Sequence, residues 1–178
     1  MKKVRLATVW LDGCSGCHMS VLDMDERLIE VVGLVDIVYS PIVDIKEYPA
    51  DVDVALIEGA VSSEEDLEKV KKIRAKTKFV IALGDCAITA NVPGMRNQFS
   101  REALGERAYV ENAANNQQPI PHEVVPKLLP LCRPVHEYVK VDLFVPGCPP
   151  PADAIHYVLT ELLAGRTPDL TGKTRFGA

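Results

Sequence analysis

The chain has 178 residues, 47% of them hydrophobic, and a formal net charge of −5 with acidic and basic residues interleaved. This size and hydrophobic content suit a single well-buried domain, and we expect residues 1–178 to form one. The acidic balance argues against a nucleic-acid footprint, and no apolar run reaches the roughly 20 residues that span a bilayer, so we expect partners that are proteins or small molecules.

The first half of the chain alternates strand patterns with helix patterns. Its predicted elements, in order, are a strand over residues 3–10, a helix over 19–32 that stops at Gly33, strands over 35–39 and 52–57, and a helix from the capping-box signal Ser62-Ser-Glu-Glu65 to about Lys76. The third strand ends directly at Glu58-Gly59. Cysteines follow the first of these strands within a few residues.

The second half continues the alternation around an irregular insertion at about 91–138. Its predicted elements are a strand over 79–83, a helix over 100–110, a strand over 141–145, and a helix over 152–164 followed by Gly165. Strands that alternate with helices predict an α/β fold with a mainly parallel sheet. The first strand-to-helix turn lacks the Gly-x-Gly-x-x-Gly pattern of a dinucleotide site, so we predict a flavodoxin-like, doubly wound sheet with helices on both faces.

Four cysteines lie in glycine or proline turns, and each turn follows a predicted strand. The turns are Leu11-Asp-Gly-Cys-Ser-Gly-Cys-His18, Gly84-Asp-Cys-Ala87 and Pro146-Gly-Cys-Pro-Pro-Pro151. Because ligands of parallel sheets collect beyond the carboxyl ends of the strands, we expect Cys14, Cys17, Cys86 and Cys148 to converge there. Four thiolates are the number that a cubane iron-sulfur cluster requires, so this set is a candidate ligand set.

Other interpretations of these cysteines remain. A Cys-x-x-Cys pair alone is typical of a thioredoxin-like redox pair or of half a zinc site, and single cysteines are often small buried residues. Isolated cysteines in two further turns disfavour zinc, which usually takes two close ligand pairs. Cys132 lacks a glycine turn, and we expect a free thiol there, although it could replace one of the four. An odd total of five scattered cysteines disfavours a disulfide framework and favours a reducing compartment.

Three further residues lie near the predicted site. Glu58 ends the third strand and either faces the same edge or is a solvated or salt-bridged loop carboxylate. His18 follows Cys17 directly and either hydrogen-bonds a sulfur, lies at an interface, or is an ordinary polar residue near a helix start. We expect Trp10 to belong to the core.

Taken together, Trp10-Leu-Asp-Gly-Cys-Ser-Gly-Cys-His-Met-Ser20, Glu58-Gly-Ala-Val61, Gly84-Asp-Cys-Ala87 and Pro146-Gly-Cys-Pro-Pro-Pro151 closely resemble the small subunit of nickel-iron hydrogenases. The stretch from Gly84 to Asn97 is similar to the third-cysteine region of the cytoplasmic, bidirectional type that belongs to NAD(P)-linked enzymes. The resemblance covers most of the chain in order.

This resemblance implies a flavodoxin-like subunit with one [4Fe-4S] cluster, the proximal one, on Cys14, Cys17, Cys86 and Cys148. Glu58 and His18 would lie behind these ligands. The partners would be a large subunit with the nickel-iron centre and diaphorase subunits with iron-sulfur clusters and FMN that reduce NAD or NADP. This chain would relay electrons in the cytoplasm and would carry no catalytic residues of its own.

Two alternatives compete with this interpretation. The iron-sulfur subunit of respiratory complex I shares the fold, but that family typically has two adjacent cysteines at the first position, whereas Ser15 and Gly16 separate Cys14 from Cys17 here. Within the hydrogenase family itself the chain shows one departure, because uptake hydrogenases often carry a glutamate after the second cysteine, where this chain has His18. The second alternative is a zinc-bearing or purely structural binding module without redox chemistry.

Overall fold

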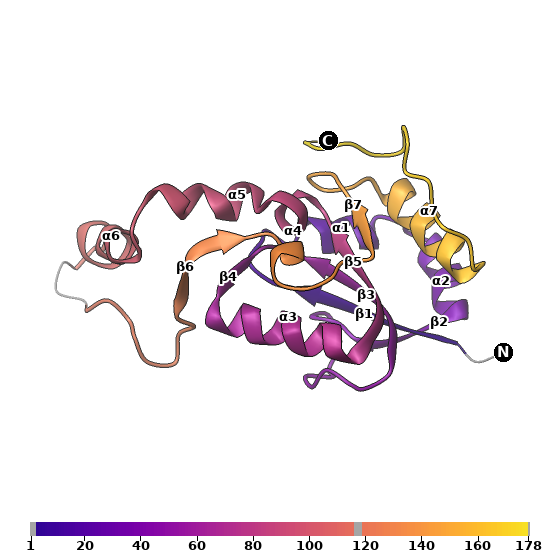
Figure 1. Cartoon of the computed structure of the whole chain (residues 1–178), viewed down its shortest axis with the longest axis horizontal. Helices are drawn as coiled ribbons and strands as arrows, with labels where there is room; N and C mark the ends of the chain where they lie inside the picture. The colour runs from indigo at the N-terminus through magenta and orange to yellow at the C-terminus, as the bar shows by residue number, and fades with distance from the viewer. Residues whose placement is uncertain (1–2, 116–118, 178) are drawn as a thin grey trace.

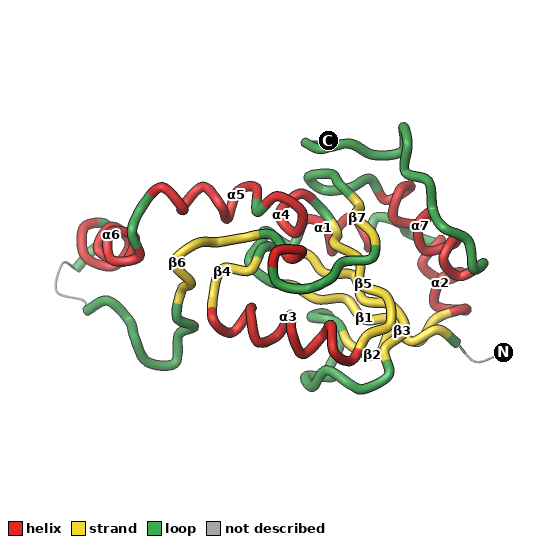
Figure 2. Tube along the Cα trace, viewed as in Figure 1, coloured by secondary structure: helices red, strands yellow, loops and turns green. Residues whose placement is uncertain are grey.

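The centre of the molecule is a five-stranded sheet, which Figures 1 and 2 show running through the middle of the computed structural model. The structure describes residues 3–115 and 119–177. The strands of the sheet are β1 Val4–Trp10, β2 Val35–Tyr39, β3 Val52–Glu58, β5 Thr77–Leu83 and β7 Leu143–Val145. They lie in the order β2-β1-β3-β5-β7, and every neighbouring pair is parallel. This order is that of a flavodoxin-like sheet and confirms the predicted fold class.

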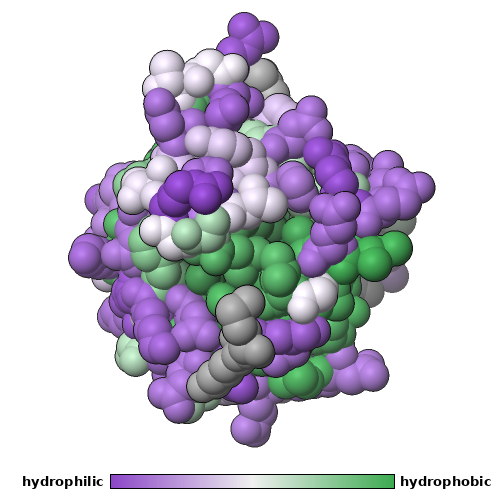
Figure 3. Space-filling model, turned by 90° about the vertical axis from the view of Figure 1, so that its right-hand side faces the viewer, coloured by the Kyte–Doolittle hydropathy of each residue, from purple (hydrophilic) through white to green (hydrophobic). Residues whose placement is uncertain are grey.

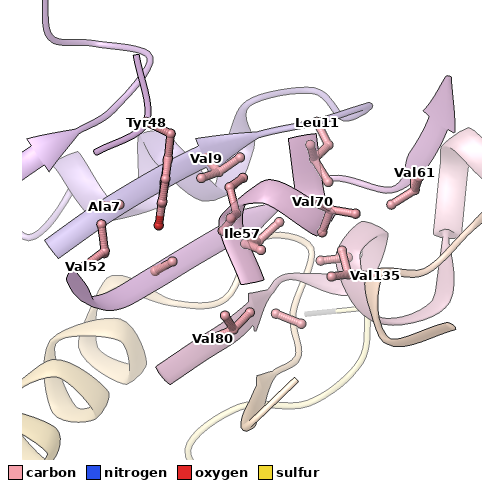
Figure 4. Packing of buried hydrophobic residues seen from close by; sticks show 14 of the residues in the cluster. Ala7, Val9, Leu11, Tyr48, Val52, Ile57, Val61, Val70, Val80 and Val135 are labelled. Carbon is pink, nitrogen blue, oxygen red and sulfur yellow. The ribbon is translucent and has the colours of Figure 1, made fainter. Parts of the chain in front are cut away.

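Helices cover both faces of this sheet. They are α1 Gly16–Leu22, α2 Arg27–Leu34, α3 Glu64–Lys76, α4 Asp85–Thr89 and α7 Ala152–Leu163. Successive strand residues point to opposite faces, so Ile57 packs in the cluster under α3, whereas its neighbour Leu56 packs in the cluster under α7. Figure 4 shows the first of these clusters, in which Val70 of α3 lies against Ile57. The strands are accordingly rich in hydrophobic residues, and β3 and β5 are buried at most positions.

The single helix predicted over residues 19–32 is wrong, because two helices occupy this region. Helix α1 ends at Leu22, and α2 begins at Arg27. In the turn between them Asp25 takes a positive φ of 51°, and Met24 is turned into the core, where it is 1% exposed. The helix stop expected at Gly33 is also wrong, since α2 continues to Leu34 and passes directly into β2.

Helix α3 begins one residue later than the capping-box signal indicated. Its N-cap is Ser63, whose hydroxyl accepts a hydrogen bond from the backbone N–H of Asp66. The Asp66 carboxylate in turn accepts from the backbone N–H of Ser63, which completes the box. Ser62 instead belongs to the short strand β4, Val61–Ser63. The predicted end at Lys76 is confirmed.

The insertion predicted to be irregular contains regular structure. Its elements are α5 Asn91–Gly94, a 3₁₀ turn Met95–Gln98, α6 Arg101–Gly105, a π-helical turn Glu106–Glu111, β6 Leu128–Arg133 and a 3₁₀ turn Val135–Glu137. The helix predicted over 100–110 corresponds to α6 and the π-helical turn. Strand β6 was not predicted; it pairs antiparallel with β4 in a second, two-stranded sheet. In Figure 1, α6 lies at the far left, away from the central sheet.

The last predicted strand is shorter than expected and begins at Leu143. Asp142 precedes it, and its carboxylate accepts a hydrogen bond of 2.8 Å from the backbone N–H of Val80 in β5. Arg74 of α3 pairs with the same carboxylate at 2.6 Å. Helix α7 ends close to its predicted boundary, and Gly165 beyond it has a φ of 71°, a conformation that favours glycine.

Apolar side chains also gather at the amino end of the strands. Figure 3 looks onto the side of the molecule that carries β2, α2 and α7, and a broad hydrophobic surface is visible there. A small hollow of about 30 Å³ in this region is lined by Val4, Leu6, Val35, Val54, Leu159, Leu162 and Leu163. Among the described residues, no helix has the length and apolar character needed to cross a membrane.

Candidate metal centre

The four predicted cysteines all lie at the carboxyl edge of the central sheet. Cys14 is in the turn after β1, and Cys17 is in the first turn of α1. Cys86 is the second residue of α4, which follows β5 after Gly84 alone, and Cys148 follows β7. These strands are parallel, so their carboxyl ends meet at one edge. Residues separated by up to 134 positions in the chain (14 to 148) are thereby brought together.

The environment of Cys17 and Cys86 disfavours a thiolate in the absence of a metal. Burial raises the pKa of the Cys17 thiol well above its usual range, and Glu58, Cys86, Cys14 and Cys148 add to the rise. Burial and then Cys148 and Cys14 raise the pKa of Cys86 to about 11. The four sulfurs are thus close enough to repel one another when charged. A metal centre removes this penalty, since thiolates bound to metal are deprotonated outright.

Gly84 allows the end of β5 to approach Cys17 closely. Its φ is 83°, and a Cβ placed on it would lie 2.2 Å from the Cys17 sulfur. Any other residue would therefore collide with a predicted ligand and would also need a conformation that L residues rarely adopt. The close packing of backbone against sulfur and the four thiols fit a metal cluster at this edge.

Glu58 is one of the most deeply buried polar residues, with 2% of its surface exposed. Its carboxylate accepts hydrogen bonds from the backbone N–H groups of Cys17 at 3.3 Å and His18 at 2.9 Å. The Nδ1 atom of the His18 ring makes a further short contact with it. The possibility of a solvated loop carboxylate is therefore wrong. Glu58 holds the start of α1, and with it Cys17, against the end of β3.

His18 lies in the interior and not on the surface of the turn, with 4% of its surface exposed. Its Nε2 atom lies 3.0 Å from the hydroxyl of Thr8, which in turn donates to Ser40 at 2.7 Å. Both ring nitrogens thus have partners, Glu58 and Thr8, that are not sulfurs. His18 does lie near a helix start, as one interpretation held, but it is buried and paired with two side chains. Trp10 is the reverse case, because we expected it in the core and it is 46% exposed.

Asp85 lies within one of the cysteine motifs, but the sequence pattern did not single it out. It is 5% exposed, and its backbone N–H donates to the carbonyl of Gly147 at 2.9 Å. The backbone N–H of Gly147 donates to the Asp85 carboxylate at 2.7 Å. The sequence signal that could have identified it is an aspartate directly before a turn cysteine, since such carboxylates commonly accept backbone N–H groups in turns.

The site is only partly covered. Cys17 is buried and Cys86 half-buried, whereas Cys14 and Cys148 are exposed. The amide nitrogen of Asn91 lies 3.5 Å from the Cys148 sulfur, and the backbone N–H of Gly16 lies 3.4 Å from the Cys14 sulfur. One side of the group of sulfurs therefore faces outward.

Cys132 is apart from the four and lies on β6. It is 1% exposed and packs with Ala60 and Ala90. Its pKa is raised to about 11, first by burial and then by Asp12. Asn97 holds its backbone in place, accepting from its N–H and donating to its carbonyl, both at 2.8 Å. Cys132 forms no disulfide, like the other four cysteines, and that it is a free thiol and not a ligand stays a prediction.

Within residues 3–115 and 119–177, no three His, Cys, Asp or Glu side chains are grouped so that they could hold one metal ion. A cubane cluster makes no such demand, because its four thiolates bind four different irons. A zinc ion, by contrast, needs all of its ligands within a single tetrahedral shell.

A family model described as NADH ubiquinone oxidoreductase, 20 Kd subunit matches residues 14–162. Among solved structures, the chain is similar to one described as the crystal structure of NAD+-reducing [NiFe]-hydrogenase in the H2-reduced state. The two share 38% identity with a TM-score of 0.94, over 98% of this chain and 99% of that one.

Curated relatives are components of hydrogenases. The delta subunit of the NAD-reducing hydrogenase HoxS of Cupriavidus necator is 41% identical, over 94% of this chain and 82% of its own length. A component of the vhu F420-non-reducing hydrogenase of Methanocaldococcus jannaschii is 40% identical over 96% of this chain. The chain spans only 59% of the length of the latter protein, which is thus considerably longer than the segment it shares.

Proposed function

The chain belongs to the NADH ubiquinone oxidoreductase 20 kDa subunit family, and from this membership we propose that it is the electron-transfer small subunit of a soluble, NAD(P)-linked nickel-iron hydrogenase. The observation that carries the proposal is the gathering of four cysteine turns at the carboxyl edge of the sheet. The names of the relatives support a hydrogenase in particular. The identity and TM-score with the NAD+-reducing enzyme support the narrower assignment.

In this proposal Cys14, Cys17, Cys86 and Cys148 hold one [4Fe-4S] cluster. When bound, such a cluster accepts and donates single electrons, at a potential set by its net charge, by hydrogen bonds to its sulfurs and by solvent exposure. The chain sets the last two of these quantities. Gly16 and Asn91 offer N–H groups to the sulfurs of Cys14 and Cys148, while burial shields Cys17.

The proposed partners follow from the same assignment. A large subunit with the nickel-iron centre would cover the outward-facing side, where Cys14 and Cys148 are exposed. Diaphorase subunits with flavin would exchange electrons with NAD or NADP. The complex would work in the cytoplasm. The described residues at the site hold and orient thiolates, and we assign this chain no bond-making step.

A second candidate is the iron-sulfur subunit of a complex I-type enzyme, which the description of the family model favours. The spacing of Cys14 and Cys17 and the hydrogenase relatives argue against it. The metal content of the partners separates the two, since only a hydrogenase partner contains nickel.

The test is anaerobic purification of the complex with its native partners, followed by analysis of iron, sulfide and nickel. We expect four irons and four sulfides on this chain, and nickel in a partner. Cys148→Ala should remove a ligand and abolish hydrogen-driven NAD(P) reduction. Cys132→Ala is the matched control, a buried cysteine outside the proposed ligand set, and should keep the cluster. Zinc without sulfide would contradict the proposal, and so would loss of the cluster in Cys132→Ala alone.

A further inference from the structure

Two of the proposed ligands are joined through the residues that precede them. Asp85 comes directly before Cys86, and Gly147 comes directly before Cys148. The backbone N–H of Asp85 donates to the Gly147 carbonyl, and the backbone N–H of Gly147 donates back to the Asp85 Oδ1 atom. A reciprocal pair of this kind fixes both the distance and the relative orientation of two loops that are 62 residues apart in sequence.

The second carboxylate oxygen of Asp85 is also engaged. Its Oδ2 atom accepts a hydrogen bond of 2.7 Å from the backbone N–H of Gly177. Nearby, the hydroxyl of Thr174 donates to the carbonyl of Pro146, so the segment from Thr174 to Gly177 is attached at two points. In Figure 1 the end of the chain runs past the loop between β7 and α7. A carboxylate that is 5% exposed thus binds the backbone of two remote segments.

The sheet itself does not need this carboxylate. Strands β5 and β7 pair through Ile81, Ala82 and Leu83, and the backbone N–H of Gly84 donates to the Val145 carbonyl at 2.8 Å. At the opposite end of the same two strands, Asp142 makes the comparable link by accepting from Val80. Asp85 therefore duplicates, at the cysteine end, a connection that already exists elsewhere. Its particular contribution is the placement of the two loops that carry cysteine.

We propose that Asp85 is a positioning residue that fixes the spacing of Cys86 and Cys148, and that the segment Thr174–Gly177 is a strap that Asp85 holds over this half of the site. The inference rests on the proposed ligand set. Residues that orient metal ligands through hydrogen bonds typically contribute about 10-fold to 100-fold to metal retention. Loss of the Asp85 carboxylate leaves Gly147 without its acceptor and lets the Cys148 loop move relative to Cys86.

The experiment compares Asp85→Ala with Asp142→Ala in the complex purified anaerobically with its partners. Both variants remove an aspartate that links β5 to β7, but only the first lies beside cysteine. We expect Asp85→Ala to change the electron paramagnetic resonance spectrum of the reduced cluster and to lose iron to a ferrous chelator about 10 times faster than the native chain. Asp142→Ala should lower the melting temperature and leave the spectrum and the rate of iron loss unchanged.

Two further variants keep the test decisive. Asp85→Asn retains the shape of the side chain but can accept only one of the two N–H groups, so we expect an intermediate rate of iron loss even if Asp85→Ala fails to fold. Removal of residues 174–178 leaves the link to Gly147 intact, and iron loss should then accelerate less than in Asp85→Ala. If the native complex holds iron and sulfide but Asp85→Ala and Asp85→Asn both retain the native spectrum and rate, the inference is overturned. If the native complex holds neither, the proposed function fails and the inference fails with it.

Discussion

Gly84 is the residue on which the approach of two cysteine loops depends most directly. It follows β5, precedes Asp85 and Cys86, and has its α-carbon next to the Cys17 sulfur. Two independent demands meet there, a positive φ and the absence of a side chain. Movement of a flexible neighbour cannot relieve the collision, because the colliding atom is a sulfur held by a buried helix turn.

We therefore predict that Gly84→Ala prevents assembly of the site. The added methyl group would lie 2.2 Å from the Cys17 sulfur, and the backbone at φ 83° and ψ 162° adds strain of about 1–3 kcal/mol. Iron and sulfide content and the melting temperature should both fall. Gly33→Ala is the matched control, because Gly33 lies in exposed helix α2 with no atom within 4 Å of the added carbon. That variant should be neutral or stabilised by up to about 1 kcal/mol.

Among single residues, the candidate ligands were easier to identify from the sequence than the residues that hold them in place. Four cysteines in glycine turns after strands were recognisable because strand, turn and thiol are local patterns. The roles of Glu58 and His18 were not, since each depends on a partner 40 residues away. Trp10 shows the same limit in the opposite direction. Its hydrophobicity predicts burial, whereas its exposure depends on the path of the turn that follows it. The assignment of Cys14, Cys17, Cys86 and Cys148 as ligands stays a prediction.

Among the secondary-structure elements, α3 has the best-defined start. Its capping box joins Ser63 to Asp66, with a hydroxyl-to-carboxylate distance of 2.8 Å and a backbone N–H to hydroxyl distance of 3.1 Å. The neighbouring Ser62, which the sequence pattern favoured, is 3.4 Å from the same carboxylate and lies in β4.

We predict that Ser63→Ala lowers the free energy of unfolding by about 1 kcal/mol, the usual loss for an N-cap hydroxyl. Ser62→Ala removes a hydroxyl of similar burial one residue earlier and should cost clearly less. Chemical denaturation of the two variants under the same conditions measures the difference. Equal losses would show that the cap assignment is wrong.

Elements were predicted correctly where the pattern that identifies them lies within one short segment of the chain. Strands β1, β2, β3 and β5 are short runs rich in β-branched and other apolar residues, and all four were predicted. The break between α1 and α2 was missed because no glycine or proline marks it, and burial of Met24 requires a core that a local pattern does not reveal. The pairing of β4 with β6 was missed for a related reason, since both strands are short and their register depends on residues about 70 positions apart, as Val61 and Arg133 are.

For the whole molecule, the structure separates a rigid sheet from the loops at its carboxyl edge. Two apolar clusters, one on each face, stabilise β1, β3 and β5, and the cysteine turns contribute only their first or last residues and Cys17 to them, namely Leu11, Cys17 and Ala87. That residues 1–178 form one domain stays a prediction.

We predict that removal of iron opens the loops and leaves the sheet folded. After treatment of the complex with a chelator, hydrogen exchange should accelerate at residues 12–17, 84–86 and 146–150, because the thiolates no longer hold these turns together. Exchange in β3 and β5 should stay slow, since their protection depends on the apolar clusters. Equal acceleration in the strands would show that the site stabilises the fold as a whole. Hydrogen exchange followed by mass spectrometry resolves the two cases.

The strand order also constrains how the protein is made. In the sheet order β2-β1-β3-β5-β7, two strands separate β1, which precedes Cys14 and Cys17, from β7, which precedes Cys148. During synthesis from the N-terminus, the first two thiols therefore leave the ribosome long before Cys148 exists. The four cysteines can come together only once β7 has joined the edge of the sheet. Delivery of any metal to it must then be a late step in biogenesis, and until that step the early thiols need protection from oxidation.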